Sequence, residues 1–382
     1  MNQVRLLMCA IGVIGANTLA LSPIAGNVAR SFTGAGATDV LTAAALYGAG
    51  TGLSALFLAP QIDRLGRQRA LVISMAGLAL ALGICTAAPT LAWLIGGQIL
   101  AGVSAGMALP AIYGLSADIA PKGRASETLG KVLTGWTLSL VAGVSLSALL
   151  ADVLHWRAVY GFLAAASLLL MLVLWRLPAP PRNVAPPIGS PLAALRVRGV
   201  WRLLLAAALF MGAFYGSYAY LGTHLSQDLG LSTAQAGLAA LIYGVGFGGA
   251  APFGRLIDRH GPLTITPLLF TALLFVYALM AFLAGHAALI LGLCLVWGGI
   301  NHLCVNSLVG QLSDIAPERR GAILGLYGAV SYGAMFAGTA SFRPVFEIYG
   351  FTGVAIAAWL CICPALAGAL YARHAARLLA QP

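Results

Sequence analysis

Apolar runs of about twenty residues dominate the chain, and short segments rich in Gly, Pro and charged residues separate them. A helix that rises about 1.5 Å per residue needs about twenty residues to cross a hydrocarbon layer about 30 Å thick. A helix also satisfies its own backbone hydrogen bonds, as a segment inside lipid must, and the alternation typical of barrel strands is absent from the sequence. The pattern therefore predicts transmembrane helices.

Runs bounded by charge, Gly or Pro predict twelve spans. These spans cover residues 4–27, 38–59, 70–89, 91–115, 128–151, 156–176, 201–224, 234–254, 263–284, 287–311, 321–342 and 351–372. The stretch RLPAPPRNVAPPIGSPLAALRVRG follows the sixth span, and its six prolines between 178 and 191 favour an extended, semi-rigid connector. We therefore expect a six-helix bundle at 1–177, a Pro-rich cytoplasmic linker at 178–200 and a second six-helix bundle at 201–382.

The composition favours an integral membrane protein, because 60% of the residues are hydrophobic, 8% are charged and the mean hydropathy is +0.93. A net charge of +11 would favour nucleic acid as the partner of a soluble protein, but these basic residues lie in loops that face anionic lipid. The six cysteines fall inside apolar segments, so we expect no metal or redox site. The sequence shows neither a nucleophile with a paired base nor a nucleotide-binding loop, so we expect no enzyme and no cofactor.

The basic residues also predict the orientation of the chain. With both termini in the cytoplasm, only Arg30, Arg157 and Arg343 of the 21 Lys and Arg residues lie outside. We therefore expect a multi-pass protein of a bacterial-type inner membrane.

Two motifs occur once in each half of the chain. The pair DR at 63–64 recurs at 258–259, 195 residues on, and DIAP at 118–121 recurs at 314–317, 196 residues on. Two markers at almost the same offset indicate an internal repeat.

The first DR pair belongs to the charged stretch APQIDRLGRQR at 59–69, and the second to FGRLIDRHG at 253–261. Each stretch follows the second span of its half, and Gly66 or Gly261 permits a tight turn there. An Asp in such a loop can pair with Arg and accept hydrogen bonds from a helix N-terminus. We expect these loops to latch the cytoplasmic side.

This loop pattern, repeated in two halves around a polar linker, resembles the GxLADRxGRK loop of the major facilitator superfamily. Closer parallels to its drug and sugar efflux branch, of the arabinose efflux permease type, lie at 117–143, 155–162 and 313–325. The resemblance implies an all-α integral membrane fold of twelve transmembrane helices in two pseudo-symmetric six-helix bundles, working by alternating access.

By that resemblance, Asp63, Arg67 and Asp118 form a charge relay that joins the loop to the fourth helix and caps the eleventh. The full cytoplasmic gate predicted in this way comprises Asp63, Arg64, Gly66, Arg67, Asp118, Asp258 and Arg259. The alternative is that these charges only enforce the orientation of the chain.

The sequence departs from the family in its fourth and fifth helices. Gln98 stands where many members carry an Arg, and Ser145 and Ser147 stand where exporters carry Pro and Gly. All ten acidic residues map to loops or helix ends, which leaves His302 as the candidate proton-coupling group at mid-membrane depth. A hydrogen-bonded structural role for His302 is the alternative.

The resemblance also implies that the first, fourth, seventh and tenth helices line a central cavity, where polar residues inside spans are expected. The predicted substrate cavity comprises Asn17, Gln98, Tyr215, Tyr218, Tyr243, Asn301, His302, Asn306, Tyr327 and Tyr332. It would suit a neutral or amphipathic molecule or, over its aromatic faces, a cation. Hydrogen bonding between helices is the alternative for these side chains.

Together these features predict a secondary transporter that exports a small organic compound, such as a drug, sugar or metabolite, driven by protons. The expected partners are a small-molecule substrate, protons and membrane lipid, without nucleic acid, and the chain is expected to act as a monomer. An importer or uniporter of a polar metabolite is the alternative, since no membrane carboxylate is predicted. A non-transporting receptor or scaffold is a remote alternative.

Overall fold

The computed structural model describes residues 3–58, 62, 65–121, 124–177, 191–316 and 319–379. The first half of the chain forms α1 (Gln3–Ala29), α2 (Ala37–Phe57), α4 (Arg67–Ala87), α5 (Leu91–Asp118), α6 (Ala125–Leu138), the π-helix η1 (Ser139–Val144), α7 (Ser145–Val153) and α8 (Trp156–Arg176). Five of the six predicted spans of this half are thus single helices, whereas α6, η1 and α7 together make the fifth.

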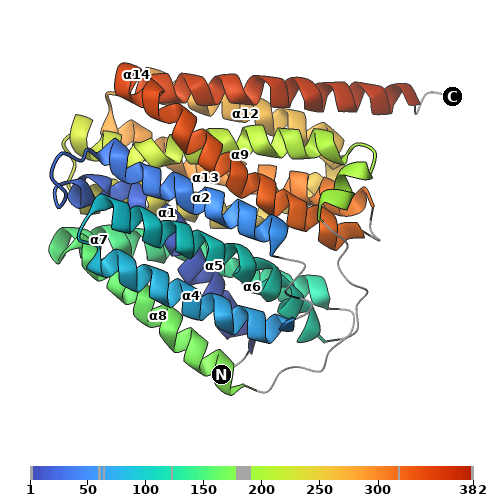
Figure 1. Cartoon of the computed structure of the whole chain (residues 1–382). Helices are drawn as coiled ribbons and strands as arrows, with labels where there is room; N and C mark the ends of the chain where they lie inside the picture. The colour runs from blue at the N-terminus through green and yellow to red at the C-terminus, as the bar shows by residue number, and fades with distance from the viewer. Residues whose placement is uncertain are drawn as a thin grey trace.

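The second half begins with a short 3-10 helix, η2 (Pro191–Arg196). It continues with α9 (Val200–Thr223), the π-helix η3 (His224–Asp228), α10 (Thr233–Gly249), the 3-10 turn η4 (Ala251–Gly254), α11 (Arg255–His260), α12 (Pro262–Phe282), α13 (Ala287–Asp314) and α14 (Arg320–Leu379). The backbone of α14 is not helical at Gly350, where φ is 62° and ψ is −161°. Figure 1 shows that α14 folds back there into two arms.

Ten helices of the described chain are long and apolar enough to cross a membrane, or eleven if α10 and the segment after it, bent by 43°, count as one span. Taking the two arms of α14 separately accounts for all twelve predicted spans. The predicted all-α membrane fold is confirmed.

The linker was predicted to be extended, and this is wrong for its last part, where η2 forms a 3-10 helix. The reason is packing: Ala194 is 1% exposed and joins a small apolar cluster with Val200, Leu312 and Ile323. The rest of the predicted linker, 178–190, lies outside the described residues.

Glycine seams at 48–52 and 243–250 let the helices approach closely. A Cβ on Gly246 would lie 2.0 Å from the carbonyl oxygen of Leu295, and one on Gly52 would lie 3.1 Å from that of Ala329. The first contact joins α10 to α13, and the second joins α2 to the first arm of α14. Small residues therefore build both the bundles and the contact between them.

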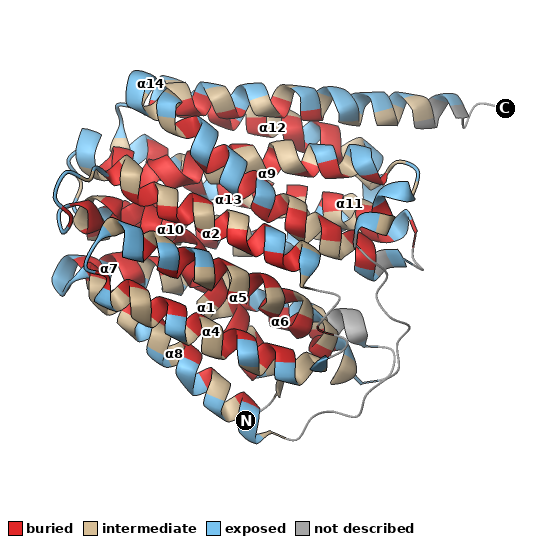
Figure 2. Cartoon of the chain, in the orientation of Figure 1, coloured by how far each residue is buried: buried red, intermediate tan, exposed pale blue. Residues whose placement is uncertain are grey.

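The helices form two groups, α1 to α8 in the lower part of Figure 1 and α9 to α14 in the upper part. Figure 2 shows exposed positions along the outer surfaces of α8 and of the second arm of α14. Those positions carry large apolar side chains, such as Leu169 (63% exposed), Trp175 (70%) and Leu360 (57%). An apolar outer surface of this extent is the surface that lipid covers.

The bundle has two ends, which we call the linker end and the far end. The linker end holds the turns at Gly66 and Gly261 and the ends of α8 and α13. The far end holds the connections 30–36, 154–155, 229–232 and 283–286 and the break at Gly350.

Candidate functional site

Polar contacts join the two halves of the chain near the far end. The Ser22 hydroxyl of α1 donates to the carbonyl of Tyr218 on α9 at 2.5 Å and accepts from the Gly222 amide at 3.4 Å. Gly222 permits this approach, since a Cβ there would lie 2.3 Å from the Ser22 carbonyl oxygen. Nearby, Thr233 of α10 donates to Asn27 Oδ1 of α1 at 2.9 Å. These bonds hold the far end shut.

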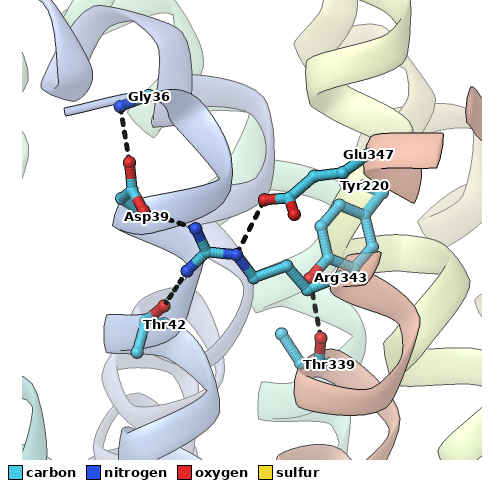
Figure 3. Close-up of polar contacts among 7 residues, drawn as sticks. All are labelled: Gly36, Asp39, Thr42, Tyr220, Thr339, Arg343 and Glu347. Atoms are coloured by element: carbon cyan, nitrogen blue, oxygen red, sulfur yellow. Dashed lines mark hydrogen bonds and ion pairs between the residues drawn. The ribbon is translucent and has the colours of Figure 1, made fainter. Parts of the chain in front are cut away.

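A charged group, here called the Arg343 cluster, adds to this closure (Figure 3). It consists of Asp39 and Thr42 of α2 and Arg343 and Glu347 of α14. The Arg343 guanidinium donates across the halves to Asp39 Oδ1 and, at 3.2 Å, to Thr42 Oγ1, and within its own helix to Glu347 Oε1 at 2.8 Å. The Gly36 amide donates to the second oxygen of Asp39 at 2.8 Å, which fixes that carboxylate at the start of α2.

Five tyrosines from both halves meet in the interior, and we call them the tyrosine ring: Tyr47, Tyr113, Tyr215, Tyr327 and Tyr332. Their phenol groups lie close enough to interact electrostatically. Tyr47 meets Tyr332 edge to face, with 6.5 Å between ring centroids. The hydroxyls of Tyr327 and Tyr332 are buried and have no hydrogen-bond partner among the described residues. The ring thus presents free polar atoms without a fixed charge.

The tyrosine ring is more exposed on the side of the linker end. Tyr113 faces the tyrosines of the second half, yet it is 38% exposed, and it lies five residues before the linker end of α5. Tyr332, which also belongs to the ring, is only 6% exposed. Exposure within the tyrosine ring therefore increases toward the linker end, whereas polar contacts join the two halves at the far end.

A second aromatic group, Phe214, Tyr218, Tyr243 and Trp297, fills the interior of the second half, with ring centroids 5.1 to 6.5 Å apart. Of the predicted cavity residues on α9, Tyr215 therefore belongs to the tyrosine ring and Tyr218 to this packed group.

The polar residues of α13 lie beside these aromatic rings. Asn301 donates to the Tyr243 hydroxyl at 3.0 Å, and its Oδ1 is buried without a partner. His302 Nε2 and Asn306 Nδ2, one helical turn apart, lie 3.0 Å from each other, and Phe247 meets the His302 ring edge to face at 4.8 Å. His302 Nδ1 also lacks a partner, so within the described part of the chain Asn301 and His302 each keep one free polar atom.

Asn17 and Gln98, by contrast, are bonded to each other. Their amide groups exchange hydrogen bonds of 3.2 and 3.3 Å between α1 and α5, and the side chains are 2% and 1% exposed. Gln98 also donates to Cys85 Sγ at 3.6 Å. In this arrangement the two amides tie helices of the first half together.

At the linker end, the structure brings two residues of the predicted gate together. Arg67 Nη1 lies 2.7 Å from Asp118 Oδ1 and 3.2 Å from the Gly114 carbonyl, and the two charged side chains are only 18% and 11% exposed. Gly66, with φ of 88°, makes the predicted tight turn into α4. Asp63 and Arg64 lie outside the described residues.

The second copy of the loop keeps the turn but not the ion pair. Gly261 has φ of 77°, close to the value at Gly66. Asp258 and Arg259, however, are exposed on α11 and form no ion pair within the described part of the chain. Pro262 follows Gly261 where Arg67 follows Gly66, so a basic partner is missing at that position.

The sequence interpretation missed Tyr47, Tyr113 and the Arg343 cluster. Tyr113 lies on the fourth span, which was expected to line the cavity, and a search of that span for aromatic residues would have found it. Asp39 and Arg343 are 304 residues apart, and no spacing rule links them.

Two groups of apolar helices, joined at one end by polar contacts, are the architecture of a membrane transporter that works by alternating access. The family model described as "Major Facilitator Superfamily" matches residues 7–339, and the chain belongs to this family. It is a multi-pass secondary transporter of small molecules and not an enzyme.

Individual relatives agree with this assignment. An uncharacterized MFS-type transporter, YwfA, of Bacillus subtilis is 26% identical over 94% of this chain and 88% of its own length. A probable sugar efflux transporter of Helicobacter pylori strain J99 is 26% identical over 92% of each chain. The crystal structure of a D-xylose–proton symporter superposes with a TM-score of 0.77 at 16% identity, covering 96% of each chain.

Proposed function

We propose that this transporter exports a small uncharged or amphipathic organic compound across a bacterial-type inner membrane, driven by protons. The linker end and both termini face the cytoplasm, because that orientation leaves only three basic residues outside. The chain acts as a monomer within the lipid. Export is favoured by the similarity to a probable sugar efflux transporter.

The tyrosine ring is the observation that carries the proposal on the substrate. Its five side chains come from both halves, so a ligand there would contact both halves. Its binding would therefore depend on how the halves are arranged. The free hydroxyls of Tyr327 and Tyr332 supply hydrogen bonds, and the aromatic faces supply apolar contact. Asn301, His302 and Asn306 of α13 extend this surface, and His302, with a free ring nitrogen, is a candidate proton-coupling group.

The two ends provide the gates. The Arg67–Asp118 pair ties α4 to α5 inside one half, and we propose that it positions the loop that closes the cytoplasmic side, with Asp63 and Arg64 in that loop. The Arg343 cluster and the Ser22 contacts close the outer side in the state described here.

The test is net accumulation of labelled antibiotics, sugars and dyes in efflux-deficient cells, with and without the protein, repeated after collapse of the proton gradient. Export predicts lower accumulation of at least one compound, and proton coupling predicts that a protonophore abolishes the difference. Higher accumulation of a polar compound would instead identify an importer, for which the lack of a described carboxylate at mid-membrane depth is a specific argument.

A further inference from the structure

His224 is a buried titratable residue at the far end, where η3 follows α9, and the transport path does not use it. It is 6% exposed, and both of its ring nitrogens have partners. Nδ1 lies 2.7 Å from Asp228 Oδ2, and Nε2 lies 2.8 Å from the carbonyl oxygen of Ala284. The ring also stacks on Phe351 at 4.8 Å with an interplanar angle of 10°.

These two partners fix the number of protons at the site. A carbonyl oxygen only accepts, so Nε2 must carry a proton. An ionised carboxylate also only accepts, so Nδ1 must carry one as well, unless the Asp228 carboxyl itself is protonated and donates to Nδ1. In either case the pair holds one proton more than a neutral histidine beside an ionised aspartate. Removing that proton leaves a lone pair facing an acceptor and breaks one of the two bonds.

The site is connected to the closed far end through its neighbours. Gln227, within the same π-turn, approaches Gly26 of α1, where a Cβ would lie 3.4 Å from its Nε2. Phe351 lies just past the break at Gly350, and Glu347 of the Arg343 cluster lies just before it. The His224 ring therefore supports the turn that presents Arg343 to the other half.

We propose that the His224–Asp228 pair is a proton-binding site whose proton holds the far end of the transporter closed. The proposal rests on the orientation given under Proposed function, in which the far end faces outward, and the 48% exposed Asp228 side chain connects the site to that solution. Acid outside then favours closure of the outer gate, and alkaline solution favours its opening.

Other titratable groups lie on the elements packed against this ring. They are His286 in the connection that provides Ala284, and Glu347 on α14. His286 is exposed and Glu347 is bonded to Arg343, and neither bonds to His224 in the described structure. His286 therefore serves as a matched control.

The experiment uses Thr18→Cys as a reporter, because Thr18 is 3% exposed and lies one turn inward of Ser22 on α1. Intact cells are labelled with a membrane-impermeant maleimide from about pH 5 to about pH 8. Each labelling rate is divided by the rate for the denatured protein at the same pH, which corrects for ionisation of the thiol. The labelling of the chain without Thr18→Cys is subtracted, which corrects for the native cysteines. Membrane abundance is checked by immunoblot.

The reporter rate in the otherwise unchanged chain, and with His286→Gln, should rise about tenfold with pH, the factor that a hydrogen bond to a charged group supplies. His224→Phe keeps the ring stacking but loses both bonds, so its rate should be high at every pH. Asp228→Asn offers an amide that donates to Nδ1 while Nε2 donates to Ala284, so the far end should stay closed at every pH.

A wild-type pH response in either His224→Phe or Asp228→Asn, or its loss with His286→Gln, would overturn the proposal. A labelling rate that does not vary with pH in the chain that carries only Thr18→Cys would also overturn it. Labelling needs no substrate, so the result does not depend on whether export is observed.

Discussion

Removing Arg343 should open the far end of this transporter by a calculable amount. Of its three side-chain bonds, only those to Asp39 and Thr42 join the halves, and the bond to Glu347 remains within α14. Arg343 and Asp39 are 35% and 36% exposed, so their ion pair contributes about 0.2–1 kcal/mol. The 3.2 Å bond to Thr42 adds about 0.5–1.5 kcal/mol. Arg343→Gln should therefore destabilise the closed far end by about 1–2 kcal/mol and raise the open fraction about 5–30-fold.

The assay is external maleimide labelling of Thr18→Cys, which reports access past the far-end contacts. Arg157→Gln is the matched control, because Arg157 also lies at the far end but donates to Ala88 at 2.8 Å within its own half. A double-mutant cycle with Asp39→Asn isolates the pair, and we expect the second substitution to add little once Arg343 is gone. Equal labelling of the Arg343 and Arg157 variants, or fully additive effects in the cycle, would refute this account of the cluster.

Three further changes test the interior, the linker end and the packing. Tyr332→Phe removes a free hydroxyl of the tyrosine ring and should raise the KM of transport about 2–10-fold, whereas Tyr160→Phe, which removes a free hydroxyl elsewhere, should leave KM unchanged. Asp118→Asn should lower the transport rate without changing the amount of protein in the membrane. Asp314 is the exposed counterpart of Asp118 in the second repeat, 196 residues on, and Asp314→Asn should leave the transport rate unchanged. Gly246→Ala should lower thermal stability by about 1–3 kcal/mol in a detergent melting assay, since its Cβ would lie 2.0 Å from a carbonyl oxygen.

The fold was predictable because the bilayer imposes a length and an apolar composition that a single sequence displays. Eleven hydropathy-derived spans coincide with described helices or pairs of segments, and the twelfth follows from the break at Gly350. The π-turns η1 and η3 were not predicted, because they shift hydrogen bonds by one residue without changing hydropathy. Ser145 and Ser147, noted as departures from the exporter motif, lie in the first turn of α7, directly after η1.

The candidate site was predicted only in part, because hydropathy indicates that a residue is in a span but not which way it faces. Asn17 and Gln98 were interpreted as lining a cavity, yet they bond to each other between α1 and α5. Tyr327 and Tyr332 were assigned to the cavity wall, and their unpartnered hydroxyls keep that hypothesis open. The sequence did not indicate a role for His224, because its two partners, Asp228 and the Ala284 carbonyl, become visible only in the fold.

The two ends of the molecule differ in what their polar contacts connect, and this difference bears on the transport cycle. At the linker end, the Arg67–Asp118 pair lies inside one half, so it survives when the halves separate. At the far end, the bonds of Ser22 and Arg343 cross between the halves and must break for the outer side to open. Each crossing bond contributes about 1 kcal/mol, so the closed state is held by a few kcal/mol, an amount that substrate binding or the loss of one proton can offset. The far end is therefore where external pH and a ligand at the tyrosine ring would compete for the same equilibrium.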